Sequence, residues 1–429
     1  MKYPIGALLL ASLFSSCNNL NQKIVDTGYI DSLINNYTFP PLVKDNEKEL
    51  LFWKNRIDPG RPGQVNESKY ASALITRYHE QGDINDVKEA ELLLKNINRT
   101  YNSTLSLPFI ALTSSALLQH QFTQADTLFQ KAKKIGINGF TSNTLSFDVN
   151  FELGRYNNAG YSLKQLEKGN DYSYYFRLSK YTHLNGTIDS AINAMLHAAG
   201  LVKESAYLQG IALSNAGDLY IHAGDLRKAA DLYKNCIRLN CADFHSITGL
   251  GWIALVHDKN DTLAEKIFKF VQTKNKLPDP LFKLYQMAQG RGDKILEKKY
   301  ASEFVAKATD TQYGEMYTKY LIEIYAGILD EPAKAESIGK EELNNRATPQ
   351  TYAWYAYSLF ANNKKDDAYK VFQQYISGEP LEGLELYYMG KMMNALGKGY
   401  NAQEFFKAAN KNKYDLSPDM AKDLENNLQ

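Results

Sequence analysis

Apolar residues near the C-terminus recur at helical spacing inside a unit of fixed length. Residues 351–414 contain this unit twice, because Ala368 and Phe372 return one unit later as Ala402 and Phe406. Residues four positions apart lie on the same face of a helix. A fixed period of 34 residues predicts an array of repeated units in this chain of 429 residues, instead of a few ordinary domains.

The small residue of this unit can be followed along most of the chain. It stands at Ala90, Ala125, Ala159, Ala191, Ala229, Ala264, Ala335, Ala368 and Ala402. The interval between Ala264 and Ala335 equals two periods, whereas the others are close to one, and a degenerate unit around residues 284–305 is expected to fill it. The two helices of a unit should touch at this position, where a larger side chain would overpack by about 1–3 kcal/mol.

Bulky residues and glycines complete the pattern. Four positions after most of these alanines stand Leu94, Phe129, Leu163, Met195, Tyr233, Phe268, Phe372 and Phe406, which are expected to fill the helix interface. The predicted turns contain Gly82, Gly154, Gly186, Gly224 and Gly397. Glycine adopts the left-handed conformation that commonly ends a helix.

This arrangement resembles the tetratricopeptide repeat, a helix–turn–helix unit with a period of about 34 residues. The clearest copy matches the family positions with Leu213, Gly217, Tyr220, Gly224, Ala229, Tyr233 and Cys236. The resemblance covers roughly residues 66–415. It implies an all-α fold, namely a right-handed superhelical solenoid of about ten helical hairpins with a capping helix at each end.

Two single helices are predicted beside the repeats. At the N-terminal side a helix should begin with Asp45 as its N-cap and place Leu50, Trp53 and Ile57 on one face. At the C-terminal side Ser417 should cap a last helix with Pro418 at its first position. The predicted division is 1–16 (signal peptide), 17–44 (tether, with Pro40-Pro41 ending a local helix), 45–65 (N-terminal capping helix and loop), 66–415 (repeats) and 416–429 (C-terminal capping helix).

The first residues have the pattern of an export signal. Lys2 precedes an apolar run over residues 5–14 that is too short to span a bilayer as a mature helix. Ser15-Ser16-Cys17 resembles a bacterial lipobox, although Phe14 stands where that motif prefers leucine. The resemblance implies cleavage before Cys17, lipidation of its thiol and, with Asn18 next to it, a place in the outer membrane. An ordinary secretory signal with an incidental cysteine is the alternative.

Composition excludes some classes of partner. Lysine plus arginine total 49 against 48 aspartate plus glutamate, so no strong field would attract nucleic acid. Most of the 30 tyrosines should pack between helices, and a minority could line a groove. Cys236 and Cys241 are expected to be two thiols or, in an oxidising periplasm, a local disulfide. Neither has histidines at zinc-ligand spacing.

No catalytic, nucleotide-binding or metal-binding motif is found, and the seven histidines are scattered. We therefore expect no enzyme activity, no cofactor and no metal. In the family, the first helix of each hairpin lines a concave groove that holds peptides or helices. The candidate groove residues are Phe176, Lys180, His183, Asn215, Asp218, Tyr357, Tyr387 and Lys391. The family's known set of side chains for C-terminal carboxylates is not found.

A loose pattern for O-glycosylation is also present. Aspartate followed by a hydroxyl residue and an apolar residue nominates Ser32, Thr127, Ser190 and Thr262 as acceptors. Helix capping explains the last three equally well. The sequence as a whole predicts a non-enzymatic, lipid-anchored scaffold or adaptor that binds an envelope protein or peptide in its groove. The alternative is an outer-membrane lipoprotein that binds a solute or glycan for a transporter.

Overall fold

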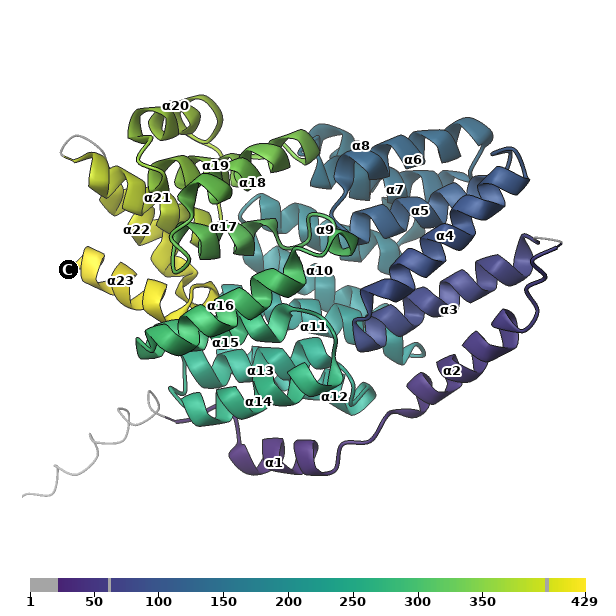
Figure 1. Cartoon of the computed structure of the whole chain (residues 1–429), viewed down its shortest axis with the longest axis horizontal. Coiled ribbons are helices and arrows are strands. Elements are labelled where there is room, and N and C mark those ends of the chain that lie inside the picture. Colours follow the sequence, from purple (N-terminus) through teal and green to yellow (C-terminus); the bar gives the residue numbers. More distant parts are fainter. Residues whose placement is uncertain (1–21, 61–62, 398–400) are drawn as a thin grey trace, which may run out of the picture.

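The computed structural model describes residues 22–60, 63–397 and 401–429, and within these ranges every regular element is a helix (Figure 1). The predicted signal peptide, residues 1–16, and the lipidation candidate Cys17 lie outside the described residues. Among the described helices, none is both long and apolar enough to cross a bilayer.

Ten hairpins of consecutive helices form the array, as the resemblance implied. The first five pair α3 (Val65–Gln81) with α4 (Ile84–Thr100), α5 (Ser106–Leu118) with α6 (Phe122–Ile135), α7 (Gly139–Glu152) with α8 (Tyr156–Leu166), α9 (Tyr172–Leu184) with α10 (Ile188–Leu201), and α11 (Ala206–His222) with α12 (Leu226–Leu239). The other five pair α13 (Phe244–Val256) with α14 (Asp261–Lys274), α15 (Asp279–Arg291) with α16 (Lys294–Ala308), α17 (Thr318–Ala326) with α18 (Pro332–Asn345), α19 (Pro349–Ala361) with α20 (Lys365–Tyr375), and α21 (Gly383–Leu396) with α22 (Ala402–Lys411). Short 3₁₀ turns are η1 (Glu167–Gly169), η2 (Thr311–Tyr313) and η3 (Lys413–Asp415).

The predicted alanines are buried between helices. All nine are buried, eight of them with no exposed area and Ala402 with 8%. The predicted degenerate unit is the hairpin α15–α16. Glu297 holds the fourth position of α16, where α14 and α18 have Ala264 and Ala335. Glu297 is 2% exposed and lies 2.7 Å from Lys294 Nζ, so an ion pair replaces the small residue there.

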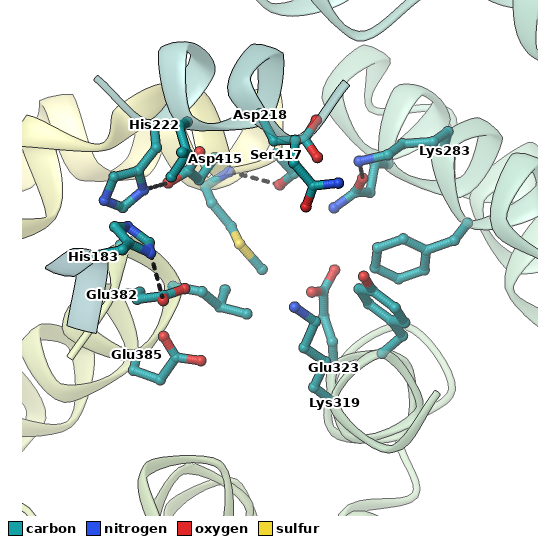
Figure 2. A pocket seen from close by; sticks show the side chains of 18 of the residues that line it. His183, Asp218, His222, Lys283, Lys319, Glu323, Glu382, Glu385, Asp415 and Ser417 are labelled. Atoms are coloured by element: carbon teal, nitrogen blue, oxygen red, sulfur yellow. Dashed lines mark hydrogen bonds and ion pairs between the residues drawn. The ribbon is translucent and has the colours of Figure 1, made fainter. Parts of the chain in front are cut away.

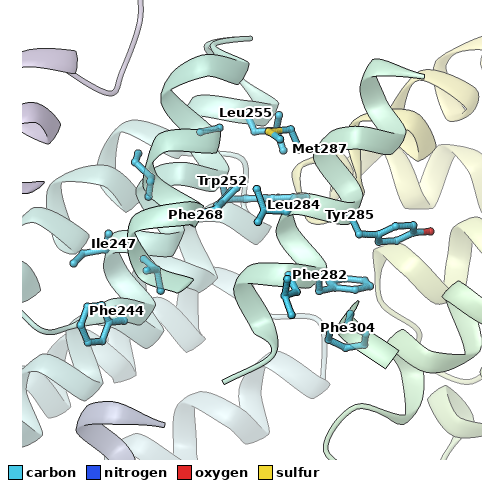
Figure 3. Packing of buried hydrophobic residues seen from close by; sticks show 14 of the residues in the cluster. Phe244, Ile247, Trp252, Leu255, Phe268, Phe282, Leu284, Tyr285, Met287 and Phe304 are labelled. Atoms are coloured by element: carbon cyan, nitrogen blue, oxygen red, sulfur yellow. The ribbon is translucent and has the colours of Figure 1, made fainter. Parts of the chain in front are cut away.

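Aromatic rings fill the space that small residues leave. A Cβ added to Gly217 or to Gly249 would come within 2.5 Å of the Tyr233 ring. These glycines belong to consecutive hairpins, so one ring packs against both of them. The largest core cluster continues from here into α13 and α15, whose apolar side chains meet in Figure 3. Helix α13 is buried nearly all round, which marks it as a central helix of the array.

The segment predicted as a tether is packed against the array from residue 24 onward. The backbone N–H groups of Ile24 and Val25 donate to the Asp258 carboxylate at 2.9 and 2.8 Å. Helix α1 (Thr27–Asn35) follows and lies along α14, with Ile30 fully buried (Figure 1). The prediction of a free tether is therefore wrong for residues 24–37, because a carboxylate far along the chain holds the segment.

The N-terminal capping helix exists but begins earlier than predicted. Helix α2 (Pro41–Lys54) starts with Pro41 at its first position, so Asp45 lies inside the helix and is not its N-cap. Pro40-Pro41 begins this helix and does not end the previous one. Proline suits a first helical position because its missing N–H would have no partner there. Leu50 is buried against α3, as the apolar face predicted.

The C-terminal capping helix α23 (Pro418–Leu428) is confirmed, with the Ser417 hydroxyl accepting from Met420 N–H. It also contacts α15, far back in the chain (Figure 1). Beside it, Trp252 Nε1 donates to the carbonyl of Tyr414 at 2.7 Å. On the other side of the molecule, the amide of Asn345 donates to the His120 carbonyl at 2.7 Å. The array therefore curls until its end touches its middle.

A substitution at one of the nine alanines tests the packing. Ala368→Leu should destabilise the protein by about 1–3 kcal/mol, because α20 approaches its neighbours closely at this fully buried position. The thermal unfolding midpoint should fall. Gln373→Leu, which places the same side chain at an exposed site of the same helix, is the control and should leave the midpoint nearly unchanged. An unchanged midpoint for Ala368→Leu would contradict the assigned register.

Candidate functional site

Three cavities adjoin one another on the interior side of the array. The central cavity, of about 400 Å³, lies between α9 and α11 on one wall and α15, α17 and the start of α21 on the other. A second cavity of about 380 Å³ extends toward α7 and α19, and a third of about 780 Å³ extends along α11 and α13. Lys319 and Tyr320 line all three cavities, so the three cavities meet at α17.

Two lysines in this wall have no carboxylate partner. Over the described part of the chain, neither Lys283 on α15 nor Lys319 on α17 has a carboxylate oxygen within 4.0 Å. Lys283 Nζ lies 3.6 Å from the centroid of the Trp252 ring and 3.2 Å from Gln286 Oε1. Burial lowers the pKa of Lys283 to about 8. By contrast, Lys180 in the facing wall pairs with Glu152 at 3.3 Å.

Glu323 stands one turn after Lys319 and faces the same cavity (Figure 2). Its side chain is 5% exposed, and its Oε1 atom has no hydrogen-bond partner among the described residues. Burial raises the pKa of Glu323 to about 7, although the charges of Lys283 and Lys319 oppose this rise. A buried polar atom without a partner is rare in folded proteins. Here it points to a ligand or to solvent in the cavity.

The facing wall carries a pair of histidines that the C-terminal turn holds in place (Figure 2). His222 Nδ1 lies 2.6 Å from Asp415 Oδ2, and its ring is 4.7 Å from that of His183. Burial disfavours the charged form of His222, but the hydrogen bond and charge of Asp415 outweigh it and raise its pKa. Burial lowers the pKa of His183. His222 is therefore the member of the pair that carries a proton first.

Half of the predicted groove residues come together. Lys180, His183, Asn215 and Asp218 all line the central cavity. Phe176 does not, since it packs against Tyr172 with ring centroids 5.6 Å apart in the cluster between α9 and α11.

The three C-terminal candidates need a correction. Tyr357 is stacked on Tyr388 with ring centroids 3.8 Å apart. Tyr387 Oη and Lys391 Nζ each donate to Asp423 at 2.8 Å. Helix α23 therefore covers Tyr387 and Lys391, whereas Tyr357 packs against the next first helix, α21.

The sequence reasoning missed Lys283, Lys319 and Glu323. Lys283 lies in α15, the first helix of the degenerate hairpin, where none of the nine alanines sets the register, and the other two lie in α17, the first helix of the next hairpin. A signal was present, because the separation of Lys283 and Lys319 along the chain is close to one repeat. Lysines at matching positions of consecutive first helices would lie side by side along one wall of the groove.

The four glycosylation candidates, Ser32, Thr127, Ser190 and Thr262, are exposed. Capping does not explain the last three, because the N-caps of α6, α10 and α14 are Gln121, Thr187 and Asn260. The modification itself stays a prediction.

Cys236 and Cys241 are free thiols in this structure. Burial raises the pKa of Cys236 to about 12, which makes it unreactive. Within the described ranges, no three histidine, cysteine or acidic side chains are grouped to hold a metal ion.

Comparison with known proteins finds only distant similarity. No protein-family model matches the chain, and no curated protein matches it. A tetratricopeptide repeat protein from Parabacteroides merdae is 15% identical with a TM-score of 0.34, over 64% of this chain and 98% of that one. The Cut9–Hcn1 assembly of the APC/C is 15% identical with a TM-score of 0.47, over 94% and 69%. PilF of Pseudomonas aeruginosa is 12% identical with a TM-score of 0.37, over 49% and 96%. The hairpins themselves show an array of helix–turn–helix units, the fold that the resemblance to the tetratricopeptide repeat implied.

The buried carboxyl of Glu323 predicts a pH dependence of stability. Its folded-state pKa of about 7 lies above the usual 4.5, so its stabilising contribution is complete below pH 4.5 and is lost as pH rises through 7. The loss is at most about 3 kcal/mol. Glu323→Gln should therefore show a smaller fall in unfolding midpoint between about pH 5 and about pH 7. Glu80 and Glu342, whose pKa values are also raised to about 7, titrate in the wild type and in the variant, so they contribute equally to both falls. Equal falls in the wild type and in Glu323→Gln would therefore contradict the raised pKa of Glu323.

Proposed function

We propose that this chain is a non-enzymatic binding protein of the bacterial cell envelope that holds part of a partner in its interior cavities. The observation that carries the proposal is the convergence of the buried Glu323 and the half-buried Lys283 and Lys319, all without full partners, on one cavity. A protein interior seldom retains such groups unless they are used. The histidines nearby have structural partners, since His222 is held by Asp415 and His245 by Asp218.

The first candidate is an adaptor that recruits an envelope protein. The interior side of the array is where the first helices α9, α11, α15 and α17 present their side chains. Three cavities in a row suit an extended segment, which binds with polar contacts to its backbone and pockets for its side chains.

The second candidate is a solute-binding protein. The size of the cavities favours it, since 380–780 Å³ falls in the usual range for small-molecule sites of about 300–1,000 Å³. Closure of the array by the C-terminal turn limits what can enter. Both candidates use the same residues.

Anchoring through Cys17 is part of the proposal. The first packed residue, Ile24, is seven positions after Cys17. An extended chain covers at most about 3.6 Å per residue, so the body would be held within roughly 25 Å of its lipid. The edge formed by α1 and α14 would then face the membrane.

Removal of the lipidation site tests the anchor. Cys17→Ala should move the protein from the membrane fraction to the soluble fraction of cells, because no acyl chain can be attached. Cys241→Ala, a cysteine of the folded body, is the control and should stay in the membrane fraction. Retention of Cys17→Ala in the membrane fraction would refute the lipid anchor, but it would not contradict the proposed binding in the cavities.

In-cell crosslinking followed by affinity purification tests the adaptor. A defined envelope protein should be recovered with the wild type and with Lys407→Glu, a charge reversal on the exposed face of α22. Recovery should fall at least about tenfold with Lys319→Glu, because the reversal places a negative charge where the three cavities meet. Equal recovery with both variants would place the partner elsewhere on the molecule. If no partner is recovered with the wild type, the solute-binding candidate replaces the adaptor candidate.

A further inference from the structure

We propose that Lys283, Lys319 and Glu323 form a carboxylate site, called here the α15–α17 site, for an amphipathic ligand with one negative charge. The apolar body of that ligand would lie in the cavity of about 780 Å³ next to it. This inference rests on the proposed function, because it assigns a ligand class to the same interior.

The pairing of charged side chains in the described part of the surrounding wall leaves two cations free to contact an anion. Other carboxylates of these cavities already have partners. Asp218 accepts from Tyr233 Oη at 2.7 Å, and Asp279 accepts from Tyr317 Oη at 2.7 Å. Asp415 and Glu385 likewise pair with His222 and with Trp354 Nε1. Among the described lysines and arginines that line the cavities, only Lys283 and Lys319 are left without an opposite charge at contact distance.

The balance within the site limits the ligand to about one charge. Two ammonium groups face one carboxyl that is easily protonated, so the site carries a net charge between +1 and +2. A half-buried cation without a contact partner is costly, and a bound carboxylate offsets part of that cost. A dianion would instead meet Glu323, whose carboxyl would have to stay protonated. Oε1 of Glu323, which has no partner among the described residues, can donate to a ligand oxygen when it carries the proton.

The adjoining cavity supplies the apolar part of the site. Its apolar lining includes Ile211, Ile221, Phe244, Trp252, Val271 and Leu277. Lys283, Lys319 and Tyr320 belong to this cavity and to the central one. A ligand whose carboxylate lies between the lysines can therefore extend its body over the Trp252 ring. Lys283 Nζ lies 3.6 Å from the centroid of this ring.

Two sources could supply this chemistry, and the test separates them. One is a free organic acid with an alkyl or aryl body, and the other is the carboxyl end of a peptide with an apolar last residue. Both place one carboxylate beside an apolar group. Only the peptide loses its charge when its end is amidated.

Calorimetric titration of the purified full-length protein tests the site with decanoate as the probe and decanol as its neutral match. Decanoate should bind, and decanol should bind at least about tenfold more weakly. Lys283→Met and Lys319→Met should each weaken decanoate binding about tenfold or more while circular dichroism stays unchanged. Lys407→Met, on the exposed face of α22, is the control and should bind as the wild type does. Glu323→Gln should still bind decanoate, and this result would separate the role of Glu323 from that of the lysines.

A second arm uses a short peptide ending in leucine, with a free and with an amidated end. Tighter binding of the free peptide than of decanoate would assign the site to a chain end, and the reverse would assign it to a free acid. Equal binding of decanoate and decanol, unchanged binding in both lysine variants, or no binding of any carboxylate would overturn the proposal. In that case, a partner that is still lost with Lys319→Glu in the crosslinking experiment would leave the proposed function standing.

Discussion

The close approach of helices at small residues determines the shape of this molecule. Tyr233 illustrates it, because its ring lies against Gly217 and Gly249 where no Cβ could be accommodated. Gly390 repeats the arrangement with Phe406, whose ring would be 2.5 Å from an added Cβ. Each such contact sets the distance and angle between successive helices. Repeated along ten hairpins, a small rotation accumulates into the curvature of the whole array.

That curvature brings distant segments together and so creates the interior. The turn at Tyr414 and Asp415 reaches Trp252 and His222, and α23 lies on α15. The buried end of α13 receives the N-terminal segment through Asp258 in the same way. These contacts replace the open groove of an uncapped array with a row of bounded cavities. The polar groups of the first helices are thereby partly removed from water, which is why the pKa values of Lys283 and Glu323 move toward neutrality.

The sequence could predict what repeats and what is local. The hairpins, the nine buried alanines and the Ser417 cap follow from periodicity and from capping rules that involve neighbouring residues. The packed N-terminal segment could not be predicted, because its partner Asp258 is far away in the chain and Pro40-Pro41 reads equally well as an end or a beginning. Tyr387 and Lys391 do lie in a first helix, as predicted, but both side chains donate hydrogen bonds to Asp423 of the capping helix. Four of the eight groove candidates reach the central cavity because α9 and α11 form one of its walls.

The part of the array that departs most from the repeat pattern is also the part that supplies the α15–α17 site. Glu297 replaces the small residue of α16, and an ion pair with Lys294 compensates for it. On the first helices of this hairpin and the next, Lys283 and Lys319 place half-buried positive charge where packing alone would favour apolar or paired side chains. Local rules that fail without an evident gain in stability are expected where a protein has a second requirement to meet. The ligand binding that we propose is such a requirement, and it would account for both the loss of the repeat signal and the unpaired lysines in one region of the chain.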